Sequence, residues 1–434
     1  MSDLIITEKK LLYPNIVYEK VLSHNAKLYI FGLMHKALAL IVIAWMNYGF
    51  FTYAMPYVPN YIRYGFYFAW LGLALISNKR FLNTFVVQLW PLFLLYFYII
   101  FLFLFVNSNL VFYIKSMAYL IMVYSIFLYY FNDKHKKFQK FLCAFLILDC
   151  IAVGINTYFN LQINSMLVRY LSTGIETRER LLGSEVFYGV ANYGYFYALV
   201  SIILLLGFLF LNYRKRNLLI FLLIFAFMVL LIQASYTIAI LFTFIFFTLL
   251  FVLKYSNKYT FVAIALIGII MLLIFQNMFA SMFYQLADIK GVPYEVSMRF
   301  KDIAYFFSGI NMSGTDLNAR LNLYSQSMDA FTNNILIGIS ITDSNVYSAG
   351  GHSAWLDLLS QFGLFSLPFS LFLFNAYKYC KNRVSKNFRS FVNVYWLYFI
   401  LLGFINTLLF ANIFTIWFLF LPMVIKSLQP HTNT

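Results

Sequence analysis

A histidine and an arginine stand out in a chain that is otherwise poor in charge. His352 follows Gly350 and Gly351 and opens a predicted apolar helix, while Arg320 lies in the polar stretch before it. An imidazole can accept or donate a proton near neutral pH, and a helix N-terminus disfavours its cationic form. Asp357 lies five positions after His352, about 140° around a helix, and is expected to face elsewhere. An arginine fork donates two parallel hydrogen bonds to a phosphate. These residue types indicate a proton acceptor or donor at His352 and phosphate binding at Arg320, with an interfacial polar role as the alternative for His352.

Three further arginines lie in segments that read as loops outside the apolar stretches. Arg178 and Arg180 precede Gly183, and Arg299 lies farther along the chain. Each could help to bind a phosphate near the membrane plane. Each also has a structural alternative, because Arg178 and Arg180 could pair with nearby glutamates and Arg299 with Asp302. The residues alone leave both readings open.

The stretch that carries Arg320 has the pattern of an amphipathic helix. It begins at Asp316, a good N-cap residue, and ends at residues 333–334, before Gly338. Its apolar residues recur at spacings of three and four: Leu321, Tyr324, Met328 and Phe331. Such a helix is expected to lie along a membrane surface and to hold Arg320 at the depth of the lipid headgroups.

Composition places these residues in a membrane protein. Of the 434 residues, 63% are hydrophobic and only 11% are charged, whereas a soluble chain carries about 25% charged residues. The net charge of +16 is explained by lysines and arginines in cytoplasmic turns, so no nucleic-acid partner is expected. Cys143, Cys150 and Cys380 offer no metal-binding spacing, and no metal or cofactor is expected.

Hydrophobic stretches long enough to span a bilayer predict an all-α, polytopic integral membrane protein of about twelve transmembrane helices. Two stretches are too long for one span and are expected to break at residues 233–235 and 406–412. Proposed turns alternate between basic and neutral, which places both termini in the cytoplasm. The predicted division is a cytoplasmic segment 1–27, transmembrane helices over 28–276 with an external loop at 160–185, a large external loop at 277–351, further transmembrane helices over 352–425, and a cytoplasmic tail 426–434.

Several short motifs then carry a resemblance. They are Asn-Ala-Arg-Leu at 318–321, Asn-Ile-Leu-Ile-Gly at 334–338, His-Ser at 352–353 with Gly-Leu-Phe-Ser at 363–366, and Arg-Leu-Leu-Gly at 180–183 followed by Asn192. Together they resemble the superfamily of O-antigen polymerases and O-antigen ligases, over roughly residues 178–425. Ser366 stands where that family often has a second glycine, and Tyr236 follows Ser235 where members often carry an arginine.

The resemblance implies a GT-C-like membrane glycosyltransferase with one large periplasmic loop that contains an amphipathic helix. Its substrates would be undecaprenyl-diphosphate-linked oligosaccharides, as donor and acceptor, at the outer face of a bacterial inner membrane. By resemblance, Arg320 and Arg180 would hold the diphosphate, with Arg178 and Arg299 as further candidates, and His352 would orient or deprotonate the attacking hydroxyl. Membrane lipids, a chain-length regulator and a flippase are the other partners that it implies.

The expected activity is therefore polymerisation of O-antigen or capsular repeat units. Two alternatives remain at this stage: a ligase that transfers the finished glycan to lipid A-core, and a flippase for lipid-linked oligosaccharides. A flippase would line a central cavity with charges inside its spans, whereas this chain has few such charges and a long external loop. The polymerase is favoured over both.

Overall fold

The computed structural model describes most of the chain and leaves the N-terminal segment and several loops undescribed. The described residues are 30–46, 59–106, 108–163, 167, 190–212, 217–234, 236–255, 274–290, 294–308, 316–342, 350–409 and 411–429. Throughout these residues the regular secondary structure is helical, without a strand. The prediction of an all-α chain is confirmed for this part of the protein.

Seven of the described helices are long and apolar enough to cross a membrane. They are α3 (Lys79–Phe105), α4 (Val111–Tyr130), α5 (Lys136–Ile163), α8 (Tyr193–Asn212), α10 (Thr237–Tyr255), the stretch Ala354–Arg383 that contains α16 (Ala354–Phe362) and α17 (Leu367–Arg383), and α18 (Lys386–Ile405). Such helices satisfy their backbone groups internally, as a hydrocarbon environment requires.

The other predicted spans correspond to shorter or more polar elements. Three are the apolar helices Ile30–Met46, α9 (Asn217–Gln233) and the stretch Thr415–Leu428, which contains α20 (Leu421–Leu428). One is α2 (Asn60–Ser77), which carries Arg63. The predicted span 259–276 lies almost wholly outside the described residues. Seven spanning helices therefore fit the structure, and the full count of about twelve stays a prediction.

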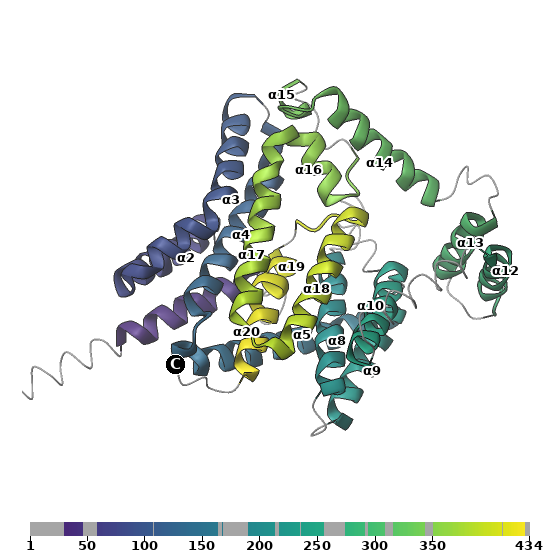
Figure 1. The fold of residues 1–434 in the computed structure, drawn as a ribbon, viewed down its shortest axis with the longest axis horizontal. Coiled ribbons are helices and arrows are strands. Elements are labelled where there is room, and N and C mark those ends of the chain that lie inside the picture. Colours follow the sequence, from purple (N-terminus) through teal and green to yellow (C-terminus); the bar gives the residue numbers. More distant parts are fainter. Residues whose placement is uncertain are drawn as a thin grey trace, which may run out of the picture.

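The bundle has two flanks around a central group of C-terminal helices. Figure 1 shows α3, α4 and α17 on one side, α8, α9 and α10 on the other, and α18, α19 (Ala411–Phe414) and α20 between them. Helix α17 packs against α3, and α10 packs against both α8 and α18. Large aromatic side chains fill the centre, among them Trp417, Tyr398 and Phe399. The C-terminal helices thus hold the two flanks together.

Both predicted helix breaks are present. Helix α9 ends at Gln233 and α10 begins at Thr237, while α18 ends at Ile405 and α19 begins at Ala411. After the second break the chain folds back along α18. The Trp417 indole N–H donates to the Tyr395 carbonyl of α18 at 3.4 Å.

Helices α8 and α10 run in the same direction, with α9 between them in the chain. Tyr193 and Tyr236, at their starts, have ring centroids 5.7 Å apart. At the other end, Lys254 donates to the Asn212 side chain at 2.7 Å. Asn212 and Lys254, each of which precedes a basic stretch of the sequence, therefore lie at the same end of the bundle.

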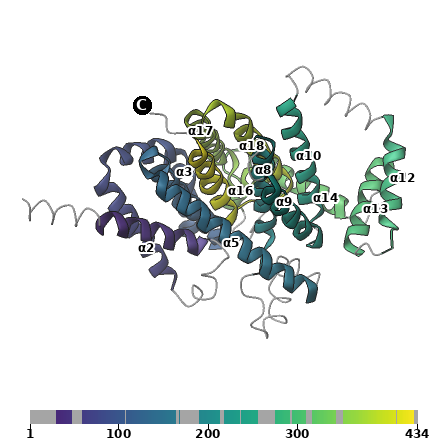
Figure 2. The same ribbon diagram turned by 90° about the horizontal axis from the view of Figure 1, so that it is seen from below.

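The polar segment predicted as one external loop is largely helical where it is described. It contains α12 (Gln276–Ala287), α13 (Tyr294–Ser308), α14 (Asp316–Asn333) and the short α15 (Ile339–Thr342). Figures 1 and 2 show α12 and α13 beside one another and apart from the bundle. Helix α14 instead packs against α16. The predicted bounds of the amphipathic helix agree with those of α14.

The stretch 354–383 is bent at a glycine. A 3-10 turn, η5 (Gly363–Ser366), separates α16 from α17, and Figure 1 shows the two helices meeting at an angle. Gly363 has φ +56°, and a Cβ there would lie 2.5 Å from the Ile335 carbonyl oxygen. The Leu364 N–H donates to that same carbonyl at 2.9 Å. The absence of a side chain at Gly363 thus lets the turn after α14 pack closely against the bend.

Candidate active site

Four helices converge on one asparagine at the break after α18. The Asn406 carbonyl accepts a hydrogen bond from the Ala354 N–H of α16 at 3.2 Å. Its side-chain Oδ1 accepts from Arg320 Nη1 of α14 at 3.5 Å and from the Tyr193 phenol of α8. Asn406 is only 1% exposed. The predicted phosphate-binding arginine is therefore held at a buried polar junction.

One face of α14 makes the contacts with the bundle. Arg320, Tyr324 and Ser327 recur at helical spacing on this face. The Tyr324 hydroxyl donates to the Ile405 carbonyl at 3.0 Å, and the Ser327 hydroxyl donates to Asp357 Oδ1 at 2.9 Å. Polar contacts from three positions on one face fix the rotation of α14 about its axis, so that Arg320 faces the break after α18.

The apolar residues of α14 face partly outward. Leu321 is 44% exposed and Met328 is 49% exposed. The expected apolar stripe is therefore partly available to a membrane surface, while Tyr324 from the same stripe turns its hydroxyl toward α18. Placement of α14 at headgroup depth stays a prediction.

The turn before α16 is tied down on both sides of His352. The Gly351 N–H donates to Asp357 Oδ1 at 3.1 Å, and the Thr407 hydroxyl donates to the Gly351 carbonyl at 3.2 Å. On the other side, the Ser353 hydroxyl donates to the Gly403 carbonyl at 3.2 Å. His352 is partly buried between these anchors. The turn thus holds His352 next to the residues that bind Arg320.

The expected start of the helix at His352 is wrong. Helix α16 begins at Ala354, and Ser353 is its N-cap, whose side chain accepts from the Leu356 N–H. The 140° helical separation between His352 and Asp357 therefore does not apply. The buried carboxylate of Asp357, which the sequence treated as secondary, accepts from the Gly351 N–H and the Ser327 hydroxyl and so ties the turn of His352 to α14.

The Tyr324 phenol stays protonated at neutral pH. Burial raises the pKa of this phenol, and the nearby Arg320 guanidinium opposes the rise. A protonated phenol can donate to the Ile405 carbonyl while its oxygen faces the guanidinium. Tyr324 therefore serves both as an anchor of α14 and as a neighbour of Arg320.

Asn192, which belongs to one of the resembling motifs, caps α8. Its Oδ1 accepts a hydrogen bond from the Tyr195 N–H at 3.1 Å. The Ala191 N–H donates to the Thr157 hydroxyl of α5 at 2.8 Å. This fixed helix start places Tyr193 against Asn406, so that Asn192 acts on the site through its neighbour.

The remaining predicted arginines are not joined to this site by the described residues. Arg178 and Arg180 lie outside the residues that the structure describes, as does the side chain of Arg299. The backbone of Arg299 belongs to α13, which both views place apart from the bundle. From the predicted set, the structure places Arg320 and the turn that carries His352 at the same break after α18.

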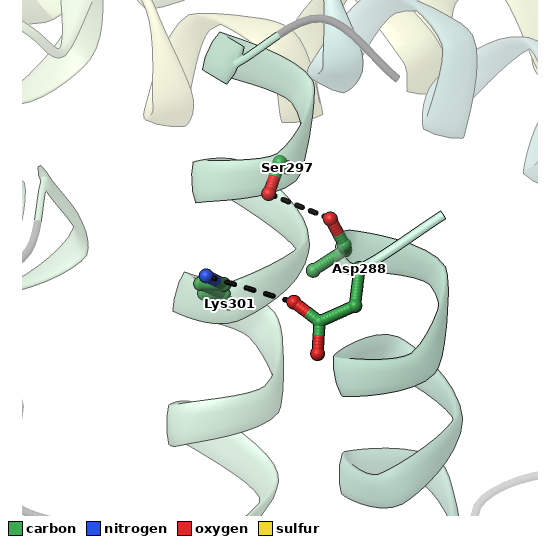
Figure 3. Close-up of polar contacts among 4 residues, drawn as sticks. Asp288, Ser297 and Lys301 are labelled. Carbon is green, nitrogen blue, oxygen red and sulfur yellow. Dashed lines mark hydrogen bonds and ion pairs between the residues drawn. The ribbon is translucent and has the colours of Figure 1, made fainter. Parts of the chain in front are cut away.

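The hairpin of α12 and α13 is closed by contacts between its own two helices. Figure 3 shows the Ser297 hydroxyl donating to the Ala287 carbonyl at 2.7 Å and Lys301 Nζ lying 3.8 Å from Asp288 Oδ1. The rings of Phe283 and Phe307 stack across the hairpin with centroids 6.1 Å apart. These contacts hold the hairpin together, and they pair Lys301 within the hairpin rather than at the break in α18.

The sequence reading missed most of the residues that surround Arg320. Tyr193 is one of 35 tyrosines, and nothing in its local sequence marks it. Asn406 had a usable signal, since it is an isolated amide at a predicted helix break. Polar residues within apolar stretches commonly line sites in membrane proteins.

Among the described residues, no group of three or more His, Cys, Asp or Glu side chains is arranged to hold a metal ion. The chemistry available here comes from a cation, a buried carboxylate, an imidazole and an amide.

No protein-family model matches this chain, and no curated protein sequence matches it either.

Proposed function

We propose that this protein polymerises lipid-linked O-antigen or capsular repeat units. It transfers the growing glycan from undecaprenyl diphosphate to a sugar hydroxyl of the next lipid-linked unit, at the outer face of the bacterial inner membrane. The observation that supports this proposal most is the position of Arg320, whose Nη1 faces Asn406 Oδ1 beside the turn that holds His352. The resemblance had assigned complementary roles to these two residues.

Arg320 would bind the diphosphate of the donor. Its guanidinium presents several N–H donors, and the partly buried position lowers competition from water. As the bond between the sugar C1 and the diphosphate oxygen breaks, negative charge grows on the leaving group, and a fixed cation stabilises that charge.

His352 would accept the proton of the attacking hydroxyl or position that hydroxyl by accepting a hydrogen bond. The hydroxyl oxygen forms the new glycosidic bond, the proton passes to the imidazole, and undecaprenyl diphosphate leaves with the bonding electrons. The carboxylate of Asp357 lies near enough to stabilise a transient imidazolium. Arg180, Arg178 and Arg299 are kept as further candidates for diphosphate binding.

The outward orientation of this site is part of the proposal. The break at Asn406 and the turn that carries His352 lie at the C-terminal end of α18. The basic turn at residues 381–389 lies at the opposite end of this helix. Basic turns favour the cytoplasmic side, which puts Asn406 and His352 on the outer side with both termini inside.

Deleting the gene in its bacterium and separating the surface glycan by length tests the activity. The proposal predicts loss of the ladder, with a single repeat still attached to lipid A-core. Loss of every attached repeat would instead favour the ligase or the flippase.

Complementation then tests the site. Arg320→Ala and His352→Ala, present in the membrane at wild-type levels, are expected to leave the single-repeat pattern. Lys301→Ala is the matched control, because it removes a cation from the same polar segment, on α13. Full-length chains with either site variant would show that the site is wrong.

A further inference from the structure

Asn406 carries a buried hydrogen-bond donor that lacks a partner in the described part of the protein. Its Nδ2 is inaccessible to water and makes no hydrogen bond, although the side-chain Oδ1 accepts from two groups. The main chain of Asn406 is satisfied, since its N–H donates to the Leu402 carbonyl at 2.8 Å and its carbonyl accepts from Ala354. A buried donor without an acceptor opposes folding, so its retention beside a cation calls for an explanation.

The orientation of this amide is fixed by its neighbours. A guanidinium has donors and no acceptor, so the oxygen of the amide must face Arg320. Rotating the amide by 180° would turn Nδ2 toward Arg320, donor against donor. The unpaired group is therefore the NH2, and it calls for an acceptor oxygen.

The acceptor that fits beside Arg320 is anionic. The Arg320 Nη1–Asn406 Oδ1 distance of 3.5 Å is at the long limit of a hydrogen bond, so this contact is weak and an incoming ligand can replace it. Because Nδ2 is covered in this structure, a phosphoryl oxygen reaches it only when the Arg320 side chain moves off Asn406. That oxygen would then accept from both the guanidinium and Nδ2. Asn406 and Arg320 would then grip the same phosphate from α18 and α14.

We propose that Asn406 is a ligand-contacting residue whose Nδ2 donates a hydrogen bond to a phosphoryl oxygen of the polyprenyl diphosphate. This inference rests on the proposed function and adds to it a second diphosphate contact from the helix break. Tyr193 has the supporting task, because its hydroxyl holds Oδ1 and thereby aims Nδ2.

The Asn406→Asp substitution separates this role from a purely structural one. Aspartate is nearly isosteric and keeps an oxygen for Tyr193 and Arg320, so a structural role would be preserved. It replaces the donor with a negatively charged acceptor, which repels a phosphate. We expect Asn406→Asp to keep wild-type thermal stability within a few degrees and to bind undecaprenyl diphosphate about 10- to 100-fold more weakly.

The binding measurement uses the purified full-length protein in detergent with undecaprenyl diphosphate, inorganic pyrophosphate and undecaprenol as separate probes. Weaker binding of the two phosphate-bearing probes, with undecaprenol unchanged, is the expected result. Binding of undecaprenyl diphosphate within twofold of wild type overturns the inference. So does an equal loss for undecaprenol, because the amide would then act on the lipid groove or the fold.

A second pair of variants covers the case in which Asn406→Asp does not fold. Asn406→Ser and Asn406→Ala remove similar volume, but only serine keeps a donor. The Asn406→Ser variant is expected to bind undecaprenyl diphosphate several-fold more tightly than the Asn406→Ala variant. Equal affinities of the two variants contradict the role of the donor. Arg320→Ala in the same assay separates the two proposals. If Arg320→Ala binds undecaprenyl diphosphate as tightly as wild type, the proposed site is rejected. If Arg320→Ala loses this binding while Asn406→Asp keeps it, only the Asn406 contact is rejected.

Discussion

The two parts of the polar segment 277–351 both carry cations on helices, but these helices have different surroundings. In α14, Arg320, Tyr324 and Ser327 contact the break after α18 and the start of α16. In α12 and α13, Ser297 and Lys301 contact the other helix of the same hairpin. The difference teaches that cations close together in the sequence of one polar segment can lie in different settings, and that the contacts of the carrying helix decide which of them reaches the bundle.

The largest effect is expected at the turn against which α14 packs. If His352 accepts the proton of the hydroxyl, His352→Ala should lower kcat by about 10²- to 10⁴-fold while leaving donor affinity nearly unchanged. Initial rates over a range of donor concentrations separate kcat from KM. A loss confined to KM would reassign His352 to binding.

Asp357 connects the two parts of the site, so its removal should loosen both. Asp357→Leu removes the acceptor of the Gly351 N–H, at a cost of about 1–3 kcal/mol. It also breaks the bond from Ser327 on α14 to α16, although the Ser327 hydroxyl keeps the Leu323 carbonyl of its own helix as an acceptor. Lower thermal stability in detergent and little activity are expected. Asp357→Asn is the control, because its amide oxygen can still accept both bonds; equal destabilisation by both variants would contradict the anchoring role.

A smaller effect is expected at Tyr324. Tyr324→Phe removes one hydrogen bond to the Ile405 carbonyl, worth about 0.5–1.5 kcal/mol. Because Ser327 and Arg320 still hold α14, the rate of chain extension should fall by no more than about tenfold. A rate as low as that of Asp357→Leu would mean that the phenol takes part in the chemistry.

The hairpin side of the comparison predicts almost no effect. The ion pair of Lys301 with Asp288 is on the surface, with the Asp288 side chain 74% exposed, and such pairs contribute about 0–1 kcal/mol. Lys301→Ala should change both thermal stability and glycan length by less than the spread of replicate measurements. A shortened glycan would show that the hairpin shares in the reaction.

Local patterns predicted the elements, and non-local contacts supplied the site. The bounds of α14 follow from hydrophobic periodicity and an N-cap residue, and the breaks after Gln233 and near Asn406 follow from span length. The role of Arg320 stays a prediction. The pairing of Tyr193 with Asn406 joins residues 213 positions apart, and a single sequence contains no signal for it. The helix start was predicted two residues early, at His352, because Ser353 is the N-cap and α16 begins at Ala354.

The central claim is that Arg320 acts on the diphosphate during glycan transfer. Its most direct test is the initial rate at which purified protein joins two undecaprenyl-diphosphate-linked repeat units, measured for wild type, Arg320→Ala and Lys301→Ala. The account predicts a rate about 10²- to 10³-fold lower for Arg320→Ala and an unchanged rate for Lys301→Ala. Equal rates for wild type and Arg320→Ala would contradict it.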